Sequence, residues 1–233
     1  MIVNGNDKLI LNAQENIYIN ELTLDGTYAI RNNKRENAKV LFDAKNVIVK
    51  NLKVNGTIYN ALEQPGSSVM YPVEKFKASN INATDTNIKH NIINIYKFAD
   101  NATVEISDST FDLNVVNSNI MRVSNIGNAK NVTITFKNID WTYETAGYTE
   151  DDKQYAGLIL FQPWPSDADS AYKSKDLTSI KTWKFIFDNC RYNGQKITEN
   201  IFGSISQVIY GYTLDAEGQN TCDINNILNI EFK

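Results

Sequence analysis

A short pattern of alternating apolar residues with a polar residue at its centre recurs along this chain. Its closest copies are DAKNVIVKNLKV, which starts at Asp43, and NAKNVTITFKNIDW, which starts at Asn128. The shared pattern is apolar, any, apolar, any, Asn, apolar, any, apolar, and looser copies occur elsewhere. The central polar residues are Glu21, Asn51, Asn80, Asp108, Asn138 and Asn189. They are 30, 29, 28, 30 and 51 residues apart, so one structural unit repeats about every 30 residues.

The spacing within each copy predicts a corner between two short strands. Alternate side chains of a strand face the same side, as Val47 and Val49 do. Leu52 follows Val49 by three positions, so one extra residue is needed to keep every apolar side chain inward. That residue, Asn51, is expected in the left-handed conformation, which Asn adopts with less strain than any other residue except Gly. Stacked corners are therefore predicted at Asn51, Asn80, Asn138 and Asn189.

A second recurring element completes each unit. Short apolar strands end in Ala-Lys-Asn or Ala-Asp-Asn at residues 44–46, 99–101 and 129–131, in step with the corners. The chain contains 32 Asn but only 11 Gly and 4 Pro, so Asn is expected to supply many of the turns. Each unit is then about three short strands, one rung of a stack.

These features predict an all-β fold, a right-handed parallel β-helix of about six to eight short rungs. The alternative is a β-sandwich or jelly roll, which also has many short strands but does not predict a shared corner every 28–30 residues. The whole chain, residues 1–233, is interpreted as one domain, and NNILNIEF near the C-terminus is a candidate further rung.

Composition excludes several function classes. With 42% hydrophobic residues and a net charge of −4, the chain lacks the basic footprint of a nucleic-acid-binding protein. No apolar run is long enough to span a membrane, and the N-terminal segment does not resemble a signal peptide. Without a secretory signal, Cys190 and Cys222 are expected to be reduced and structural.

Between the corners at 138 and 189 lie about 20 extra residues. GLILFQP is expected to supply a strand there, flanked by long loops at 142–155 and 162–183. Long loops in compact domains are often functional, and aromatic residues with carboxylates are typical of a protein interface or a sugar site. A purely structural role, covering an open edge, is the other interpretation. The binding or interface candidates are Trp141, Tyr143, Tyr148, Tyr155, Trp164 and Tyr172.

No catalytic residue is predicted. Aligning the repeats gives two outward columns: Thr23, Lys53, Asn82, Thr110, Asp140, Arg191 and Asp25, Asn55, Thr84, Asp112, Thr142, Asn193. Neither column stacks two acids on adjacent rungs, as a glycosidase would need. His90 is the only histidine, which excludes a zinc site with several His ligands. The acids of the long loops fit no known calcium loop, so no metal and no cofactor are expected.

The repeats resemble the pectate-lyase-like, single-stranded right-handed β-helix superfamily over about residues 15–195. That resemblance implies a ladder of stacked corner asparagines, which Asn51, Asn80, Asn138 and Asn189 match and from which Glu21 and Asp108 depart. It implies fold more than function, because such folds include lyases, hydrolases, adhesins and viral structural proteins.

In its overall character, rich in Asn and Tyr and poor in His and Cys, the chain is similar to a bacteriophage virion protein. The expected function is a non-enzymatic structural or adhesive component of a phage particle, a capsid decoration or fibre subunit made in the host cytoplasm. Its expected partners are other virion proteins or itself, as a homo-oligomer such as a trimer. The contact is expected through residues 142–183 or the C-terminal strand. The alternatives are a polysaccharide-degrading tailspike enzyme and an adhesin that binds a surface glycan.

Overall fold

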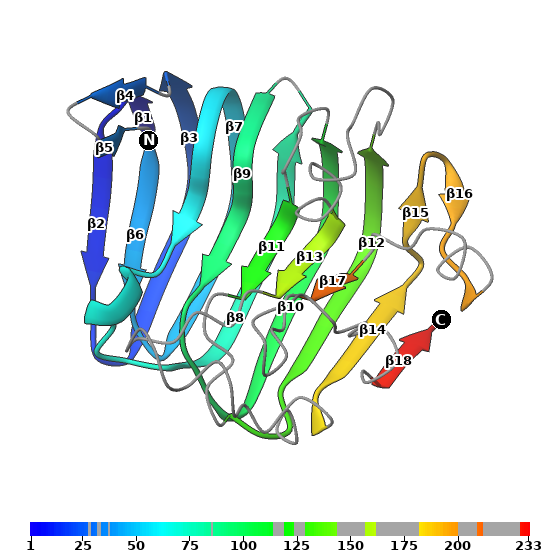
Figure 1. Ribbon diagram of the computed structural model, residues 1–233. Helices are drawn as coiled ribbons and strands as arrows, with labels where there is room; N and C mark the ends of the chain where they lie inside the picture. The colour runs from blue at the N-terminus through cyan, green and yellow to red at the C-terminus, as the bar shows by residue number, and fades with distance from the viewer. Residues whose placement is uncertain are drawn as a thin grey trace, which may run out of the picture.

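The computed structural model is nearly all β-structure, arranged as a parallel β-solenoid (Figure 1). It describes residues 1–27, 29–31, 34–36, 38–84, 86–113, 119–123, 129–143, 157–161, 182–199, 209–211 and 229–233. Gly66–Ser68 forms one short 3₁₀ turn, η1. Two short hairpins are antiparallel: β4 (Ala29–Arg31) pairs with β5 (Lys34–Glu36), and β15 (Arg191–Tyr192) pairs with β16 (Gln195–Lys196). β15 also pairs in parallel with β12.

One column of parallel strands carries the corners. Its strands, in order along the stack, are β1 (Ile2–Gly5), β3 (Asn16–Thr27), β7 (Asn46–Glu63), β8 (Val73–Ala83), β10 (Phe98–Leu113), β12 (Thr133–Tyr143), β14 (Lys184–Asp188) and β18 (Asn229–Phe232). Each is paired in parallel with the next. The predicted C-terminal rung is therefore present as β18.

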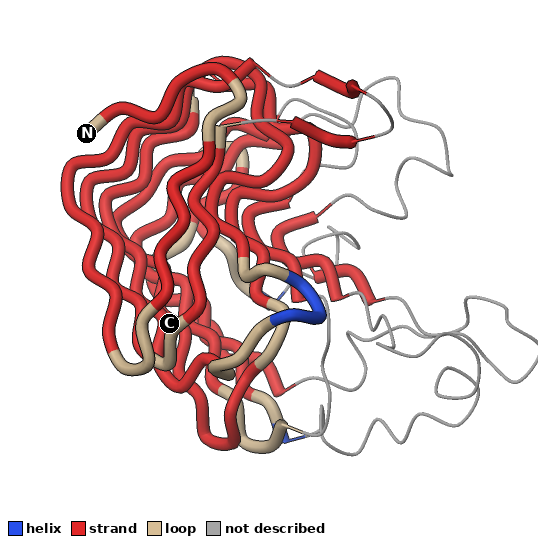
Figure 2. The backbone as a smooth tube through the Cα atoms, turned by 90° about the vertical axis from the view of Figure 1, so that its left-hand side faces the viewer, coloured by secondary structure: helices blue, strands red, loops and turns tan. Residues whose placement is uncertain are grey.

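A second parallel column carries the return strands. Its strands are β2 (Lys8–Asn12), β6 (Lys39–Asp43), the end of β7, β9 (Thr86–Ile95), β11 (Asn119–Val123), β13 (Gly157–Phe161) and β17 (Ile209–Gly211). The chain passes from one column to the other in every repeat, and Figure 2 shows the resulting coil end-on. This confirms the parallel β-helix. A sandwich would instead have antiparallel sheets.

The core fills the space inside the coil because equivalent apolar residues stack from rung to rung. Register pairs Val47 with Phe76, Phe76 with Val104 and Val104 with Ile134, and all four are fully buried. Burying such a side chain contributes about 1.5–3 kcal/mol. Near the C-terminal end, the rings of Phe136, Phe187 and Phe232 form a continuous stack with centroid distances of 5.5 and 5.6 Å.

Every predicted corner is confirmed by its backbone. The six central residues of the repeat all have positive φ, between 51° and 57°, including the non-Asn members Glu21 and Asp108. The Asn51 side chain donates to Asn20 at 2.8 Å, and Asn80 donates to Asn51 at 2.6 Å. Asn138 donates to Asp108 at 2.7 Å, and Asn189 donates to Asn138 at 2.9 Å.

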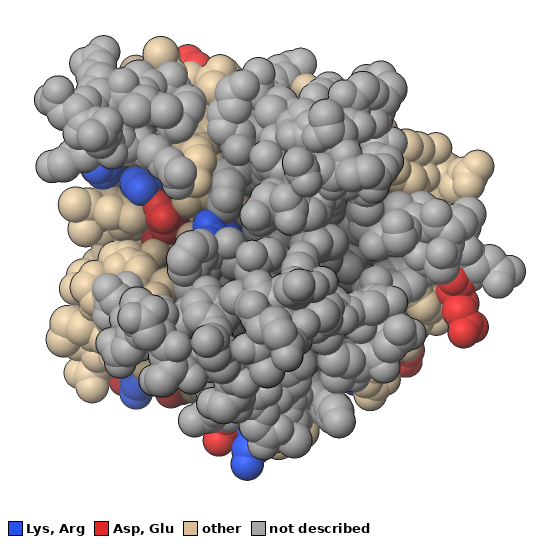
Figure 3. Space-filling model, in the orientation of Figure 1, with Lys and Arg blue, Asp and Glu red and all other residues tan. Residues whose placement is uncertain are grey.

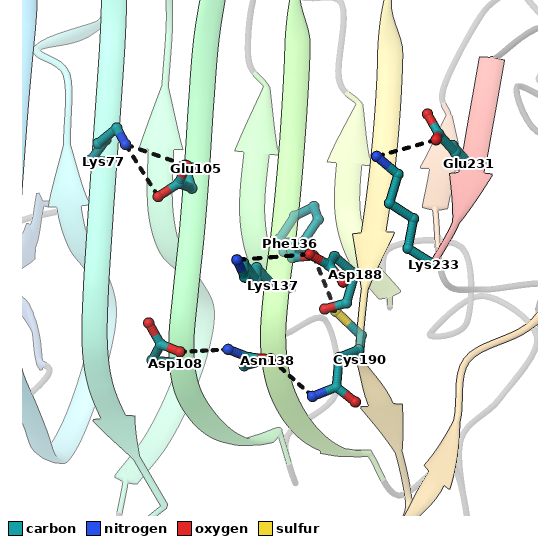
Figure 4. A network of polar contacts seen from close by, with 11 residues as sticks. Lys77, Glu105, Asp108, Phe136, Lys137, Asn138, Asp188, Cys190, Glu231 and Lys233 are labelled. Carbon is teal, nitrogen blue, oxygen red and sulfur yellow. Dashed lines mark hydrogen bonds and ion pairs between the residues drawn. The ribbon is translucent and has the colours of Figure 1, made fainter.

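Asp108 changes the character of this ladder. Its carboxylate accepts from the Asn138 amide, and this hydrogen bond is the main cause that lowers the Asp108 pKa (Figure 4). A carboxylate has no N–H with which to continue the ladder toward Asn80. The Ser109 hydroxyl instead accepts the backbone N–H of Ile81 at 3.0 Å, so the rungs remain connected at this point.

Replacing Asn138 by valine is expected to destabilise the fold by roughly 1–3 kcal/mol, because a β-branched residue is strained at positive φ. The measurement is the free energy of unfolding in urea. Asn138→Gly is the matched control, because it relieves the strain but still removes both ladder hydrogen bonds of the amide. If valine cost no more than glycine, strain at the corner would not be the cause.

Candidate functional site

Trp141 is the one interface candidate whose side chain lies in the described part of the chain, and it lies in the core. It is 2% exposed, and its ring packs 4.6 Å from the ring of Tyr192. The reason is alternation: Trp141 follows Ile139 by two positions on β12, so both point inward. Trp141 is therefore a packing residue in this conformation, which corrects its assignment as a binding or interface candidate.

The remaining interface candidates stay predictions. The backbone of Tyr143 ends β12, but its side chain lies outside the described part of the structure. The residues Tyr148, Tyr155, Trp164 and Tyr172 lie outside the described residues. The strand expected from GLILFQP is present as β13 and pairs in parallel with β11 and β17.

The strand register tests the outward columns directly. The whole first column is confirmed, because each of its residues is the register partner of the next. The pairs, in order along the stack, are Thr23–Lys53, Lys53–Asn82, Asn82–Thr110, Thr110–Asp140 and Asp140–Arg191. In the second column, Asp25 pairs with Asn55 and Asp112 with Thr142. The Thr142 hydroxyl donates to the Asp112 carboxylate at 2.9 Å. Each acid in these register pairs thus lies beside a hydroxyl, an amide or a cation.

The wall before the corner carries ion pairs between successive rungs (Figure 4). Lys77 contacts both carboxylate oxygens of Glu105 at 3.3 Å, and Lys137 lies 3.9 Å from Asp188. Glu231 pairs with Lys184, and the hydrogen bond from Lys184 is the main cause that lowers the Glu231 pKa. Such half-exposed pairs contribute about 0–1 kcal/mol each. Their larger effect is to fix which side chains face each other along the shaft.

An open groove of about 560 Å³ crosses this wall over β3, β7, β8 and β10. Tyr18 and Ile48 provide its apolar surface, and the Tyr18 side chain is 71% exposed. Lys77 and Glu105 provide charge, and Ser107 lines it as well. The repeat pattern alone did not reveal this groove. The available signal was Tyr18 itself, an aromatic residue at an outward position between the inward Ile17 and Ile19.

Figure 3 shows acidic and basic side chains interspersed over the described part of the face in view. Among the described residues, no group of three or more His, Cys, Asp or Glu side chains is placed to hold a metal ion. No helix among them is long and apolar enough to cross a membrane. The backbone of His90 lies in β9, but its side chain is outside the described part of the structure.

Cys190 has a structural environment. It is buried behind the corner at Asn189, and its thiol donates to the carbonyl of Phe136 at 3.2 Å. Burial raises the pKa of the thiol to about 11, so it stays protonated and weakly nucleophilic at neutral pH. The expectation of a reduced, structural cysteine fits this position. Cys222 lies outside the described residues.

No protein-family model, curated protein or solved structure matches this chain. The β-helix therefore rests on the strand register and the corner backbone, and neither the pectate-lyase-like superfamily nor a phage origin has support from relatives.

Proposed function

We propose that this chain is a non-enzymatic structural or adhesive subunit of a larger particle. The observation that carries the proposal is the arrangement of outward acids, which connect one rung to the next. Glu105 pairs with Lys77, Asp188 with Lys137 and Glu231 with Lys184, while Asp112 accepts from Thr142. These carboxylates are engaged in contacts between neighbouring rungs.

A polysaccharide hydrolase needs a different arrangement. Its two carboxyl groups lie about 5–10 Å apart across the scissile bond, and one of them has a raised pKa so that it can donate a proton. In the register, Asp140 lies between Thr110 and Arg191, so neither neighbour in its column is a second carboxyl group. In the groove, Asp108 has a lowered pKa, which suits a hydrogen-bond acceptor rather than a general acid.

The particle proposed is a bacteriophage virion, in which the chain would be a capsid decoration or fibre subunit. This part of the proposal rests on the general character of the sequence, which is rich in Asn and Tyr and has one His and two Cys. Pull-down of purified virion proteins by the immobilised chain tests it. Specific capture of a capsid or tail protein supports the assignment, and failure to capture any virion protein contradicts it.

Absence of catalysis is a separate expectation with its own test. The chain is incubated with capsular and pectic polysaccharides, and reducing ends and the absorbance of unsaturated products are followed. We expect no product above the level given by heat-denatured protein. Cleavage that Asp140→Asn abolishes would overturn the non-enzymatic assignment in favour of a tailspike-type enzyme.

A carbohydrate-binding adhesin is the second candidate, and the groove favours it. An exposed aromatic ring beside hydroxyl, carboxylate and ammonium groups is the kind of surface that contacts a sugar ring while hydrogen-bonding its hydroxyls. Titration calorimetry with surface glycans would show binding that Tyr18→Ala removes. Met70→Ala is the matched control, because Met70 is 65% exposed and does not line the groove. Equal loss in both variants would contradict a site at Tyr18.

A further inference from the structure

Exposed apolar side chains gather at the N-terminal end of the coil. Met1, Ile2 and Ile10 are each about two-thirds exposed, and they lie on or next to β1 and β2. Leu9 and Leu11 point inward from β2 but are only partly buried. Large exposed apolar patches on a folded protein mark interaction surfaces. We call this end, formed by β1, β2 and residues 16–20 of β3, the N-terminal face.

The same face presents free strand edges. Within the described residues, β1 pairs only with β3, and β2 pairs only with β6. Residues 16–20 of β3 pair with β7 on one side. On their other side β1 does not reach them, because its pairing with β3 begins at Thr23. Figure 2 looks onto this end and shows the first strands facing the viewer. Unpaired backbone N–H and C=O groups on an exposed edge favour pairing with another chain.

The opposite end is closed to such pairing on one wall. There β15 turns back through Asn193 and Gly194, both at positive φ, and pairs antiparallel with β16. β16 lies on the side of β15 away from β12, where the next parallel strand of a longer stack would lie. A second copy whose β1 continued this wall would collide with β16. Head-to-tail stacking of copies along this wall is therefore blocked by the hairpin.

We propose that two copies of this chain associate through their N-terminal faces. Because the hairpin closes the C-terminal end on one wall, the contact uses the same face in both copies, and an isologous contact of this kind stops at a dimer. Charge is compatible with this symmetry: Asp7 and Lys8 are adjacent and exposed where the chain passes from β1 to β2. A twofold axis can therefore set Asp7 of one copy opposite Lys8 of the other. This contact differs from the one expected from the sequence, which favours residues 142–183 or the C-terminal strand as the surface between copies. The inference goes beyond the proposed function, since it requires neither a particle nor a glycan.

Sedimentation velocity of the purified chain over a range of concentrations tests the dimer. We expect a species of twice the 26.4 kDa chain mass that dissociates on dilution. Ile10→Lys should weaken the dimer by about tenfold or more, because it places a charge in an apolar contact. Ile186→Lys is the matched control: Ile186 is a partly exposed, outward-facing isoleucine on β14, near the opposite end of the stack, so the same change of side chain should leave the dimer unchanged.

Circular dichroism and thermal unfolding of each variant establish that it is folded. If Ile10→Lys fails to fold, Ile2→Lys on β1 replaces it. A monomer at every concentration would overturn the inference, and so would open-ended growth into fibres. Equal weakening by Ile186→Lys would also overturn it, because the effect would then not be specific to the N-terminal face. The polysaccharide and virion-binding experiments do not depend on any of these outcomes.

Discussion

Gly56→Ala is expected to destabilise the fold by roughly 2–5 kcal/mol, through backbone strain and a steric clash together. Gly56 has φ +71°, and a Cβ there would lie 2.3 Å from the carbonyl oxygen of Gly26. The two glycines are paired in register between β3 and β7, so the clash is with the backbone of the adjacent rung and no side chain can move to relieve it. The free energy of unfolding in urea measures the loss.

Gly194→Ala is the control that separates the two causes. Gly194 has a similar φ of +78°, but a Cβ there meets nothing within 4 Å. Its substitution should cost only the left-handed strain, about 1–2 kcal/mol. Equal losses at both positions would show that contact between rungs adds nothing at Gly56, and would contradict the close stacking of β3 on β7.

Trp141→Ala is expected to reduce the free energy of unfolding by about 3–5 kcal/mol, the range for removing a large aromatic side chain from a core. Trp141 is 2% exposed, packs against Tyr192 and is paired in register with Phe111 on the preceding rung. Removing it leaves a cavity between two rungs that can close only if strands move. Urea unfolding of the two proteins gives the difference.

Trp141→Phe is the matched variant, because it keeps an aromatic ring in the same stack and should cost clearly less than alanine. The competing hypothesis, that Trp141 is a surface anchor for a partner, predicts the reverse pattern. Under it, alanine would leave stability within about 0.5 kcal/mol of the parent and would abolish binding to a partner. That result would contradict the buried position.

The corners show what can be predicted well from one sequence. Asn51 is the one extra residue between two segments of alternating side chains. Only a left-handed backbone conformation at this position keeps Val49 and Leu52 on the same side of the chain. This requirement involves neighbours in the chain, so the pattern of residue types is enough to identify it. Glu21 and Asp108 occupy the equivalent positions and also have positive φ, although their residue type is less typical.

Trp141 shows where the use of the sequence went wrong. The repeat pattern places it at an inward position, two residues after Ile139, whereas the aromatic segment that follows it favours an interface residue. Register with Phe111 and Tyr192 decides the matter in favour of the core. Periodicity was the better guide, because burial follows the side of the strand rather than the composition of the next loop.

The sequence by itself determined the repeat, the corners, the inward columns and the class of fold, because each depends on alternation and backbone preference over a few residues. Only the tertiary structure decided the Lys77–Glu105 and Lys137–Asp188 pairs, the groove at Tyr18, the glycine contact between β3 and β7, and the different character of the two ends. These features join residues 28 to 51 positions apart, or depend on which strands have a single partner within the described part of the chain. They follow from the register between strands of neighbouring rungs. That register depends on how the side chains of the rungs pack together and not on any local sequence pattern.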